Sequence, residues 1–303
     1  MGRGPVNVIN TENLSRHYGR RVGVEAVDLA VPEGEIFGFL GPNGAGKTTT
    51  IRLLLGFLRP SAGRARVFGL DCWRQSKLVK RDVGYLPGDL RLYPWMTLES
   101  ALKIIGGVRG IDLAKPGRAL AERFRLETKL RARKMSRGTR QKLGLVMALA
   151  HEPRLLILDE PTSGLDPLIR QELTACLRER AACGHTVFFS SHALSEVEQL
   201  CDRVAIVRDG RIVADQTLQA MRRRARRSVT LEFADAAAAR RIETPRFLAV
   251  TSRSDRRWSC ELVGGTGELV RWAAQQPLED IAIGPPDLES LFRRYYQNEG
   301  TVA

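Results

Sequence analysis

The sequence predicts an α/β protein built around a parallel sheet, and three observations carry this prediction. Short apolar runs that end at turns indicate strands, and they alternate with segments of helical periodicity. Two of the runs, Leu155–Leu158 and Thr186–Phe189, are apolar on both faces, which is typical of central strands in a covered sheet. A glycine-rich turn at 41–46 joins a strand to a helix. Together these features favour an α/β core.

The apolar runs place the expected strands in order along the chain. They are 6–9, 24–31, 36–40, 64–68, 83–86, 155–158, 186–190 and 203–207, and the last is followed by a hairpin through Asp209-Gly210. The expected helices are 47–56, 97–106, 117–125, 137–150, 168–182 and 194–200. Residues 96–150 contain helical patterns without a strand, so they are predicted to form a helical subdomain inserted into the core.

The composition changes after residue 220, and this change predicts a second domain. An arginine-rich joint at 221–227 leads into new strand alternation at 228–233. Further strand candidates lie at 246–251 and 257–263, and a helical pattern follows at 286–296. We expect a main domain over 6–220 and a small α+β domain over 224–303. The arginines fit either a contact with lipid headgroups or a solvated helix end or linker.

Bulk composition narrows the class of protein. The chain of 303 residues is 43% hydrophobic and 27% charged, which is typical of a soluble globular protein. It contains neither a signal-peptide pattern nor an apolar run of about 20 residues, the length that a membrane span needs. The five cysteines form no Cys-x-x-Cys pair, which argues against a disulfide framework and a zinc site and favours a reducing cytoplasm.

The net charge of +14 is concentrated in one part of the chain. Residues 96–150 hold thirteen Lys and Arg against four Asp and Glu, a local charge of +9. No RNA-binding or helix-turn-helix pattern accompanies these charges, so a nucleic-acid partner is not expected. A solvated basic face and a face next to an anionic membrane both fit the pattern.

Residues Gly41–Thr48, Gly-Pro-Asn-Gly-Ala-Gly-Lys-Thr, have the pattern of a phosphate-binding loop. The glycines let backbone N–H groups point inward around an anion, and the following helix adds the positive end of its dipole. Lys47 is expected to reach the β- and γ-phosphates, and the Thr48 hydroxyl to bind Mg²⁺. The residues expected to bind the nucleotide here are Gly41, Pro42, Asn43, Gly44, Ala45, Gly46, Lys47, Thr48 and Thr49.

Two acids and a histidine follow buried strands farther along the chain. Asp159 and Glu160 come directly after Leu155–Leu158, so they belong at the carboxyl edge of the sheet, where the phosphate loop also opens. Asp159 is expected to hold Mg²⁺ through water, and Glu160 to accept a proton from the attacking water. His192 follows the strand at 186–190 and is expected to contact the γ-phosphate and position the water.

These motifs, with Met135–Thr139 and Ser163–Asp166, resemble in order and spacing the ATP-binding cassette of ABC transporters. The resemblance covers about residues 6–217. It implies a P-loop NTPase core with an antiparallel β region and an inserted helical subdomain. It also implies two cassettes that face head to tail with ATP between them. The same resemblance assigns Ser136 and Gly138 to the ATP of the opposite subunit, Asp166 to coupling across the interface, and Tyr18 to stacking on adenine.

The chain departs from the family pattern at two places. Arg137 and Thr139 stand where the family has Gly and Gln, a variation that resembles the branch exporting drugs and polyketides. The family's glutamine after Gly84–Pro87 is replaced by Gly88, which is followed by Asp89. Gly88 has no side chain that could bind Mg²⁺, so that contact is expected to be absent or supplied by Asp89 or water.

The resemblance implies an ATPase that binds ATP and Mg²⁺ and drives an exporter through separate transmembrane permease subunits. The expected partner is a second cassette, most simply a copy of this chain, and the expected location is the cytoplasmic face of the cell membrane. The 96–150 block is the surface expected to dock the permease. Two other interpretations stay open: a non-transport cassette of DNA repair or the ribosome, and a regulatory module that senses nucleotide without hydrolysing it.

Overall fold

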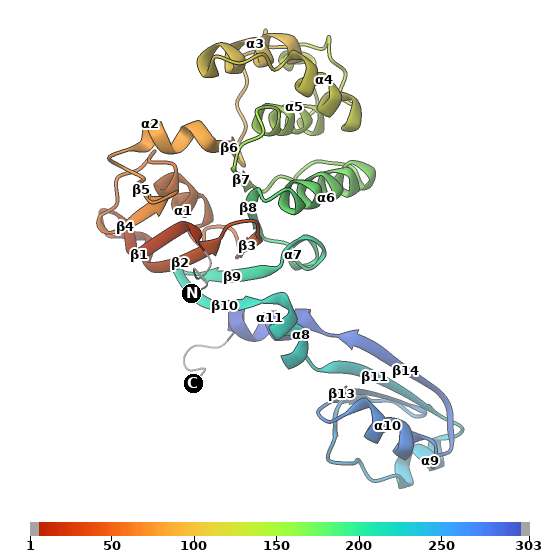
Figure 1. Ribbon diagram of the computed structural model, residues 1–303. Helices are drawn as coiled ribbons and strands as arrows, with labels where there is room; N and C mark the ends of the chain where they lie inside the picture. The colour runs from red at the N-terminus through yellow and green to blue at the C-terminus, as the bar shows by residue number, and fades with distance from the viewer. Residues whose placement is uncertain (1–5, 298–303) are drawn as a thin grey trace, which may run out of the picture. The chain divides into compact units, whose positions relative to one another are not determined.

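The computed structural model describes residues 6–297 and divides the chain into two compact units, one ending at Thr217 and the other starting at Leu218 (Figure 1). The first unit contains two sheets with helices around them, and the second contains one sheet. The expected α/β architecture of the first unit is confirmed, including a mainly parallel sheet.

The larger sheet of the first unit has the strand order β10-β9-β3-β8-β7-β6. Its strands are β3 Ile36–Leu40, β6 Val83–Leu86, β7 Leu155–Asp159, β8 Thr186–Ser191, β9 Arg203–Arg208 and β10 Arg211–Thr217. All neighbours are parallel except the β9–β10 hairpin. Every residue of β3, β7 and β8 is buried, as their continuous apolar sequences predict.

The smaller sheet of the first unit is antiparallel, with the order β2-β1-β4-β5. Its strands are β1 Asn7–Tyr18, β2 Arg21–Pro32, β4 Ala62–Val67 and β5 Leu70–Asp71. Helix α1, Lys47–Leu54, contributes Ile51, Leu53 and Leu54 to a hydrophobic cluster that includes residues of both sheets. The helix therefore lies between the sheets, and the phosphate-loop sequence that precedes it is anchored on a rigid core.

The block from 96 to 150 is helical, as expected, and its first helix is capped at both ends by its own sequence. Helix α3, Leu98–Arg109, begins with a capping box between Thr97 and Ser100 and ends at Gly110, whose φ is 70°. Helix α4, Ala114–Arg123, and the short helix η2, Ala132–Lys134, lead to α5, Arg137–Leu149. The remaining helices of the unit are α2 Ser76–Val79, η1 Lys80–Asp82, α6 Pro167–Ala182 and α7 Leu194–Leu200.

The second unit has a four-stranded antiparallel sheet in the order β12-β13-β11-β14. Its elements are α8 Leu218–Arg224, β11 Arg227–Phe233, α9 Ala236–Arg241, β12 Leu248–Arg253, β13 Arg257–Leu262, α10 Thr266–Ala273, β14 Leu278–Pro286 and α11 Leu288–Gln297. From β11 to β14 this is the β-α-β-β-α-β order of a ferredoxin-like unit. Ala239 of α9 and Leu269 of α10 join one core cluster with Trp258, so both helices cover the same sheet face.

Several expected elements differ from the structure for identifiable reasons. Strand β1 continues to Tyr18 rather than stopping at residue 9, because its register shifts interrupt the alternation that reveals a strand. Helix α4 starts at Ala114 rather than 117, because Pro116 lies in the first turn, where its missing N–H costs no helical bond. Six further elements, which are short or contain Gly or Pro, were not predicted from the sequence: α2, α8, α9, α10, β5 and β14.

No helix among residues 6–297 is both long and apolar enough to cross a lipid bilayer.

A substitution at Phe188 tests how much the aromatic packing on the larger sheet contributes to stability. Its ring is fully buried and lies 5.8 Å from the ring of Phe37 and 5.3 Å from that of Phe39, between centroids. Phe188→Ala is expected to lower the free energy of unfolding by about 3–5 kcal/mol, because it removes buried aromatic area and leaves a cavity. Denaturant unfolding followed by circular dichroism measures the change.

Val108→Ala serves as the control, because Val108 is 84% exposed and its truncation is expected to change stability by less than about 0.5 kcal/mol. A cost at Phe188 no greater than at Val108 would contradict the packing described here.

Candidate functional site

The loop between β3 and α1 forms a cradle of backbone groups. Gly44 and Gly46 have φ of 84° and 106°, conformations that side chains other than glycine rarely adopt. A Cβ atom at Gly41 would lie 2.4 Å from the carbonyl oxygen of Val207, so no side chain fits there. No side chain caps α1, and its first-turn N–H groups therefore remain available to an anion.

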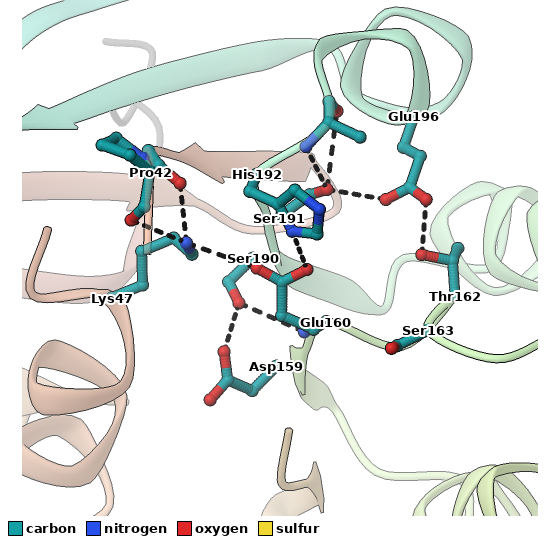
Figure 2. Close-up of polar contacts among 12 residues, drawn as sticks. Pro42, Lys47, Asp159, Glu160, Thr162, Ser163, Ser190, Ser191, His192 and Glu196 are labelled. Carbon is teal, nitrogen blue, oxygen red and sulfur yellow. Dashed lines mark hydrogen bonds and ion pairs between the residues drawn. The ribbon is translucent and has the colours of Figure 1, made fainter. Parts of the chain in front are cut away.

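Lys47 is held in the cradle by the loop that precedes it. The side chain is only 6% exposed, and Nζ donates hydrogen bonds to the carbonyl oxygens of Gly41 (2.6 Å) and Pro42 (3.2 Å) (Figure 2). It also lies 3.3 Å from Oε1 of Glu160. A buried ammonium group needs such partners, and their arrangement fixes a positive charge at the mouth of the loop.

Asp159 ends β7 and is 2% exposed. Its Oδ2 accepts a hydrogen bond from Thr48 Oγ1 (2.7 Å), and its Oδ1 accepts one from Ser190 Oγ. The parallel strands β7 and β8 pair Asp159 with Ser190, so the sheet register itself brings these groups together. The two expected metal-binding residues, Thr48 and Asp159, are therefore adjacent.

Glu160 follows the strand in a left-handed backbone conformation with φ of 51°. Its N–H donates to the carbonyl oxygen of Ser190 (3.1 Å) and to Ser190 Oγ (3.3 Å). The carboxylate faces Lys47 through Oε1, a charge contact without hydrogen-bond alignment, and His192 through Oε2. A left-handed residue other than glycine is uncommon and is maintained here by these surrounding contacts.

His192 follows β8 and lies on the other side of Glu160. Its Nδ1 is 2.7 Å from Glu160 Oε2, and its side chain is 58% exposed, whereas that of Glu160 is 20% exposed (Figure 2). The structure therefore brings together all five residues expected to perform the chemistry. They are Lys47, Thr48, Asp159, Glu160 and His192.

The donor set at Thr48 and Asp159 suits a magnesium ion. Both side chains offer oxygen atoms, and Mg²⁺ commonly uses one or two protein ligands together with water and substrate phosphates. Among residues 6–297 no group of three or more His, Cys, Asp and Glu side chains forms a dedicated metal cage. The residues present fit a metal that is shared with a phosphate ligand.

Gly88 lies against this metal-binding pair. A Cβ atom built on Gly88 would be 3.3 Å from Asp159 Oδ2, so the residue occupies the position next to the acid without adding a ligand. Asp89 does not replace the missing side chain. Its carboxylate is 78% exposed and pairs with Arg91 at 3.0 Å.

Tyr18 lies at the end of β1 and is 41% exposed, so it is not a core tyrosine. Its ring packs beside Gly23, where a Cβ atom would meet Tyr18 Cε2 at 2.7 Å. The carbonyl oxygen of Gly23 in turn lies against Gly46 of the loop. The guanidinium of Arg16 stands 5.0 Å from the centre of the Tyr18 ring. This position leaves the ring accessible, and adenine stacking by Tyr18 stays a prediction.

The three residues that the resemblance assigns to the partner's ATP and the interface lie at the starts of α5 and α6. They are Ser136, Gly138 and Asp166. Ser136 caps α5 by accepting the N–H of Thr139 (3.1 Å), and Asp166 caps α6 by accepting the N–H of Ile169 (3.0 Å). The Ile169 bond lowers the pKa of Asp166 below its usual value. A Cβ atom at Gly138 would lie 2.5 Å from the carbonyl oxygen of Gly164. Their expected contacts with nucleotide stay predictions.

Arg137 connects α5 to the same turn. Its Nη2 donates to Ser163 Oγ at 2.6 Å, and its Cγ would lie 3.3 Å from a Cβ atom at Gly164. The glycine at 164, whose φ is 76°, therefore accommodates the large residue that replaces the family's glycine at 137.

Three further residues, which were not predicted from the sequence, organise the site. Ser190 bridges Asp159 and Glu160, and Gln141 of α5 donates to the carbonyl oxygens of Glu160 (3.3 Å) and Pro161 (3.0 Å). Glu196 of α7 accepts hydrogen bonds from Thr162 and Ser191. The place of Ser190 directly before Ser191-His192 is a sequence signal for its role, whereas those of Gln141 and Glu196 depend on tertiary contacts.

Comparison with known proteins agrees with this geometry. Residues 24–163 match the family model described as ABC transporter. The bacitracin transport ATP-binding protein BcrA of Bacillus licheniformis is 37% identical over 231 residues, which cover 75% of this chain and 76% of that protein. The Nod factor export ATP-binding protein I of Rhizobium etli is 36% identical over 215 residues, covering 69% and 68%.

A solved structure described as the ATP-binding subunit of an ABC transporter has the same fold. It superposes with a TM-score of 0.67 at 33% sequence identity and covers 72% of this chain and 92% of its own.

Lys47 provides the direct test of the cradle. Lys47→Met is expected to weaken ATP binding by about 1.5–3 kcal/mol, roughly 10- to 150-fold, because it removes the charged hydrogen bonds that a phosphate receives. Titration with a fluorescent ATP analogue measures the affinity. Lys103→Met, at an exposed lysine of α3, is the matched control and is expected to bind normally. Equal affinity of both variants would mean that the loop does not hold the phosphates.

Proposed function

We propose that this chain, which belongs to the family of ABC transporter ATP-binding proteins, powers the export of a cargo through separate membrane subunits. As a member of that family it binds ATP and is an ATPase. The observation that supports ATP hydrolysis as the source of power is the convergence of Lys47, Asp159, Glu160 and His192 at one edge of the sheet. Beyond family membership, we propose the direction of transport, the partners and the roles of single residues.

The catalytic role falls to Glu160 as the general base for water that attacks the γ-phosphate. Its carboxylate is held on both sides, by Lys47 at 3.3 Å and by His192 at 2.7 Å, so its direction is fixed before the reaction begins. Lys47 supplies the positive charge that stabilises the phosphate oxygens. His192 orients Glu160 and the attacking water, and the N–H groups of the loop bind the phosphates.

Thr48 and Asp159 are the residues that would hold Mg²⁺. The ion, when bound, neutralises charge on the phosphate oxygens. Ser190 fixes Asp159 from the side opposite Thr48, which keeps the carboxylate in one orientation. Because Gly88 adds no ligand next to Asp159, we expect weaker metal binding than a side-chain ligand at that position would give.

A second copy of this chain is the proposed partner for the nucleotide. In a head-to-tail pair Ser136 and Gly138 would contact the ATP held by the opposite loop, and Asp166 would lie at the interface. The supporting observation is that these residues stand at the starts of α5 and α6, where helix N-termini favour an anion. Two neighbouring residues of α5 connect its start to Glu160: Arg137 donates to Ser163 Oγ, and Gln141 donates to the carbonyl oxygens of Glu160 and Pro161.

A groove between the core and the helical block is the proposed docking site for a permease segment. Its volume is about 240 Å³, and it is lined by Leu55, Phe57, Lys80, Val83, Tyr85, Ile105, Arg109, Met147, Ala148 and His151. Phe57 is 50% exposed, packs near Tyr85 and lies under the ammonium group of Lys80 at 4.6 Å. Its apolar side chains, together with the positive charges of Lys80 and Arg109, suit an amphipathic segment that carries an acidic residue.

Two groups in this groove are kept neutral. Burial, together with the charge of Arg109, lowers the pKa of His151 to about 4. Burial, with a contribution from Asp159, raises the pKa of Tyr85 to about 12. Near neutral pH the charge of the groove therefore comes from Lys80 and Arg109, because His151 and Tyr85 are uncharged. Docking there would place the chain at the cytoplasmic face of the membrane through its permease.

Export is favoured over the alternatives by the relatives and by Arg137. One of the relatives is described as a transport protein and another as an export protein. A regulatory module without hydrolysis would not require Glu160 to be held between Lys47 and His192. A cassette acting on DNA or ribosomes remains the alternative, and recovery of the chain with nucleic acid instead of membranes would support it.

The role of Glu160 is tested by Glu160→Gln. The variant is expected to bind ATP normally and to lower kcat by about 100- to 10,000-fold, because the amide cannot accept the proton from water. Light scattering after size-exclusion chromatography with MgATP is expected to detect an accumulated dimer. Hydrolysis at the parent rate would rule out Glu160 as the base.

The docking groove is tested by Phe57→Asp, which places a charge among its apolar side chains. The variant is expected to reduce at least several-fold the amount of chain recovered with membranes of the source cells, while its ATPase rate in solution is unchanged. Val270→Asp, at a residue of the second unit that is 51% exposed, is the control. Equal loss in both variants would show that the groove is not the docking site.

A further inference from the structure

Glu196 joins the two chain segments that carry the catalytic pair. Its Oε1 accepts a hydrogen bond from Thr162 Oγ1 at 2.6 Å, and its Oε2 accepts one from Ser191 Oγ at 2.6 Å (Figure 2). Thr162 lies two residues after Glu160, and Ser191 lies directly before His192. We call this three-residue contact of Thr162, Ser191 and Glu196 the Glu196 bridge.

The bridge fixes the backbone on the His192 side. Ser191 is fully buried, and its hydroxyl both donates to Glu196 and accepts the N–H of Ala193 at 2.9 Å. The residues on either side of His192 are therefore tied to one hydroxyl group. The imidazole itself is 58% exposed, so its direction toward Glu160 depends on this backbone more than on packing around the ring.

The bridge also fixes the segment after Glu160. Thr162 is 8% exposed, and its hydroxyl donates to Oε1 of Glu196. Glu160 is already tied to β8 by its N–H, which donates to Ser190. The Ser190 contact and the Glu196 bridge thus hold the two segments together at two points.

We propose that Glu196 is a positioning residue for hydrolysis, which holds His192 in register with Glu160 by binding Thr162 and Ser191 together. This inference rests on the proposed function of Glu160 and His192. Because both carboxylate oxygens of Glu196 accept hydrogen bonds from these hydroxyl groups, Glu196 acts through Thr162 and Ser191 and not by contact with the phosphates.

The ordinary role of an acid in the first turn of a helix does not account for this geometry. Glu196 lies in the first turn of α7, where any carboxylate interacts favourably with the helix dipole. A dipole interaction requires no particular partner for either oxygen. Here both oxygens are used by hydroxyl groups of two different segments, and these hydroxyl groups are buried and need acceptors.

The test is steady-state ATP hydrolysis by Glu196→Ala and Glu196→Gln in the full chain. Glu196→Ala is expected to lower kcat about 10- to 100-fold while the affinity for ATP changes less than about threefold, because the cradle around Lys47 is intact. Glu196→Gln is expected to retain most of kcat, since an amide can accept from one hydroxyl and donate to the other. Glu99→Ala, an acid in the first turn of α3, is the control.

A double-mutant comparison separates the positioning of His192 by Glu196 from a purely structural role of Glu196. In a His192→Ala background, Glu196→Ala is expected to lower kcat less than about twofold further, because its effect acts through His192. If thermal unfolding shows that Glu196→Ala does not fold, Thr162→Val replaces it, with an expected drop in kcat of about 3- to 10-fold from the loss of one hydrogen bond.

Three results would overturn the inference. The first is a kcat of Glu196→Ala equal to that of the Glu99→Ala control. The second is a loss of kcat in Glu196→Gln as large as that in Glu196→Ala. The third is that Glu196→Ala lowers kcat by the same factor in the parent and in the His192→Ala background. Absence of hydrolysis by the parent chain would instead contradict the proposed function, so the two failures are distinguishable.

Discussion

The contact of the Glu160 carboxylate with Lys47 on one side and His192 on the other is the interaction on which the site depends. It joins three pieces of chain that follow three neighbouring strands, β3, β7 and β8. Parallel strands place their carboxyl ends at one edge, so the sheet brings these residues together before any ligand is present. The left-handed backbone at Glu160 then turns its side chain between the two partners.

Burial explains why the charged side chains at this edge of the sheet have so many hydrogen-bond partners. Lys47 and Asp159 are almost fully buried, and a charge in such a place is tolerated only with close polar partners. Carbonyl groups of the loop satisfy Lys47, while Thr48 and Ser190 satisfy Asp159. The same contacts that compensate burial also fix the direction of each group, and fixed charges and dipoles stabilise a transition state more effectively than mobile ones.

The core elements were predicted well from the sequence because the apolar runs that mark them are local features. The apolar runs at β3 and β6 gave their bounds, and the strand ends at Asp159 and Ser190 placed the acids and His192 correctly. Strand β1 was underestimated because register shifts hide its alternation, and β14 was missed because it contains prolines. The roles of Gln141 and Glu196 were not predictable, since Gln141 lies 20 residues from its partner Pro161, and Glu196 lies 34 residues from Thr162, one of its two partners. These residues meet only in the folded chain.

The most direct test of the central claim is hydrolysis of ATP by the purified chain in water enriched in ¹⁸O, followed by mass spectrometry of the products. Attack of water on the γ-phosphate, with Glu160 as base, predicts one solvent oxygen in the released phosphate and none in ADP. Solvent oxygen in ADP, or no release of phosphate above that of the Lys47→Met variant, would contradict the account.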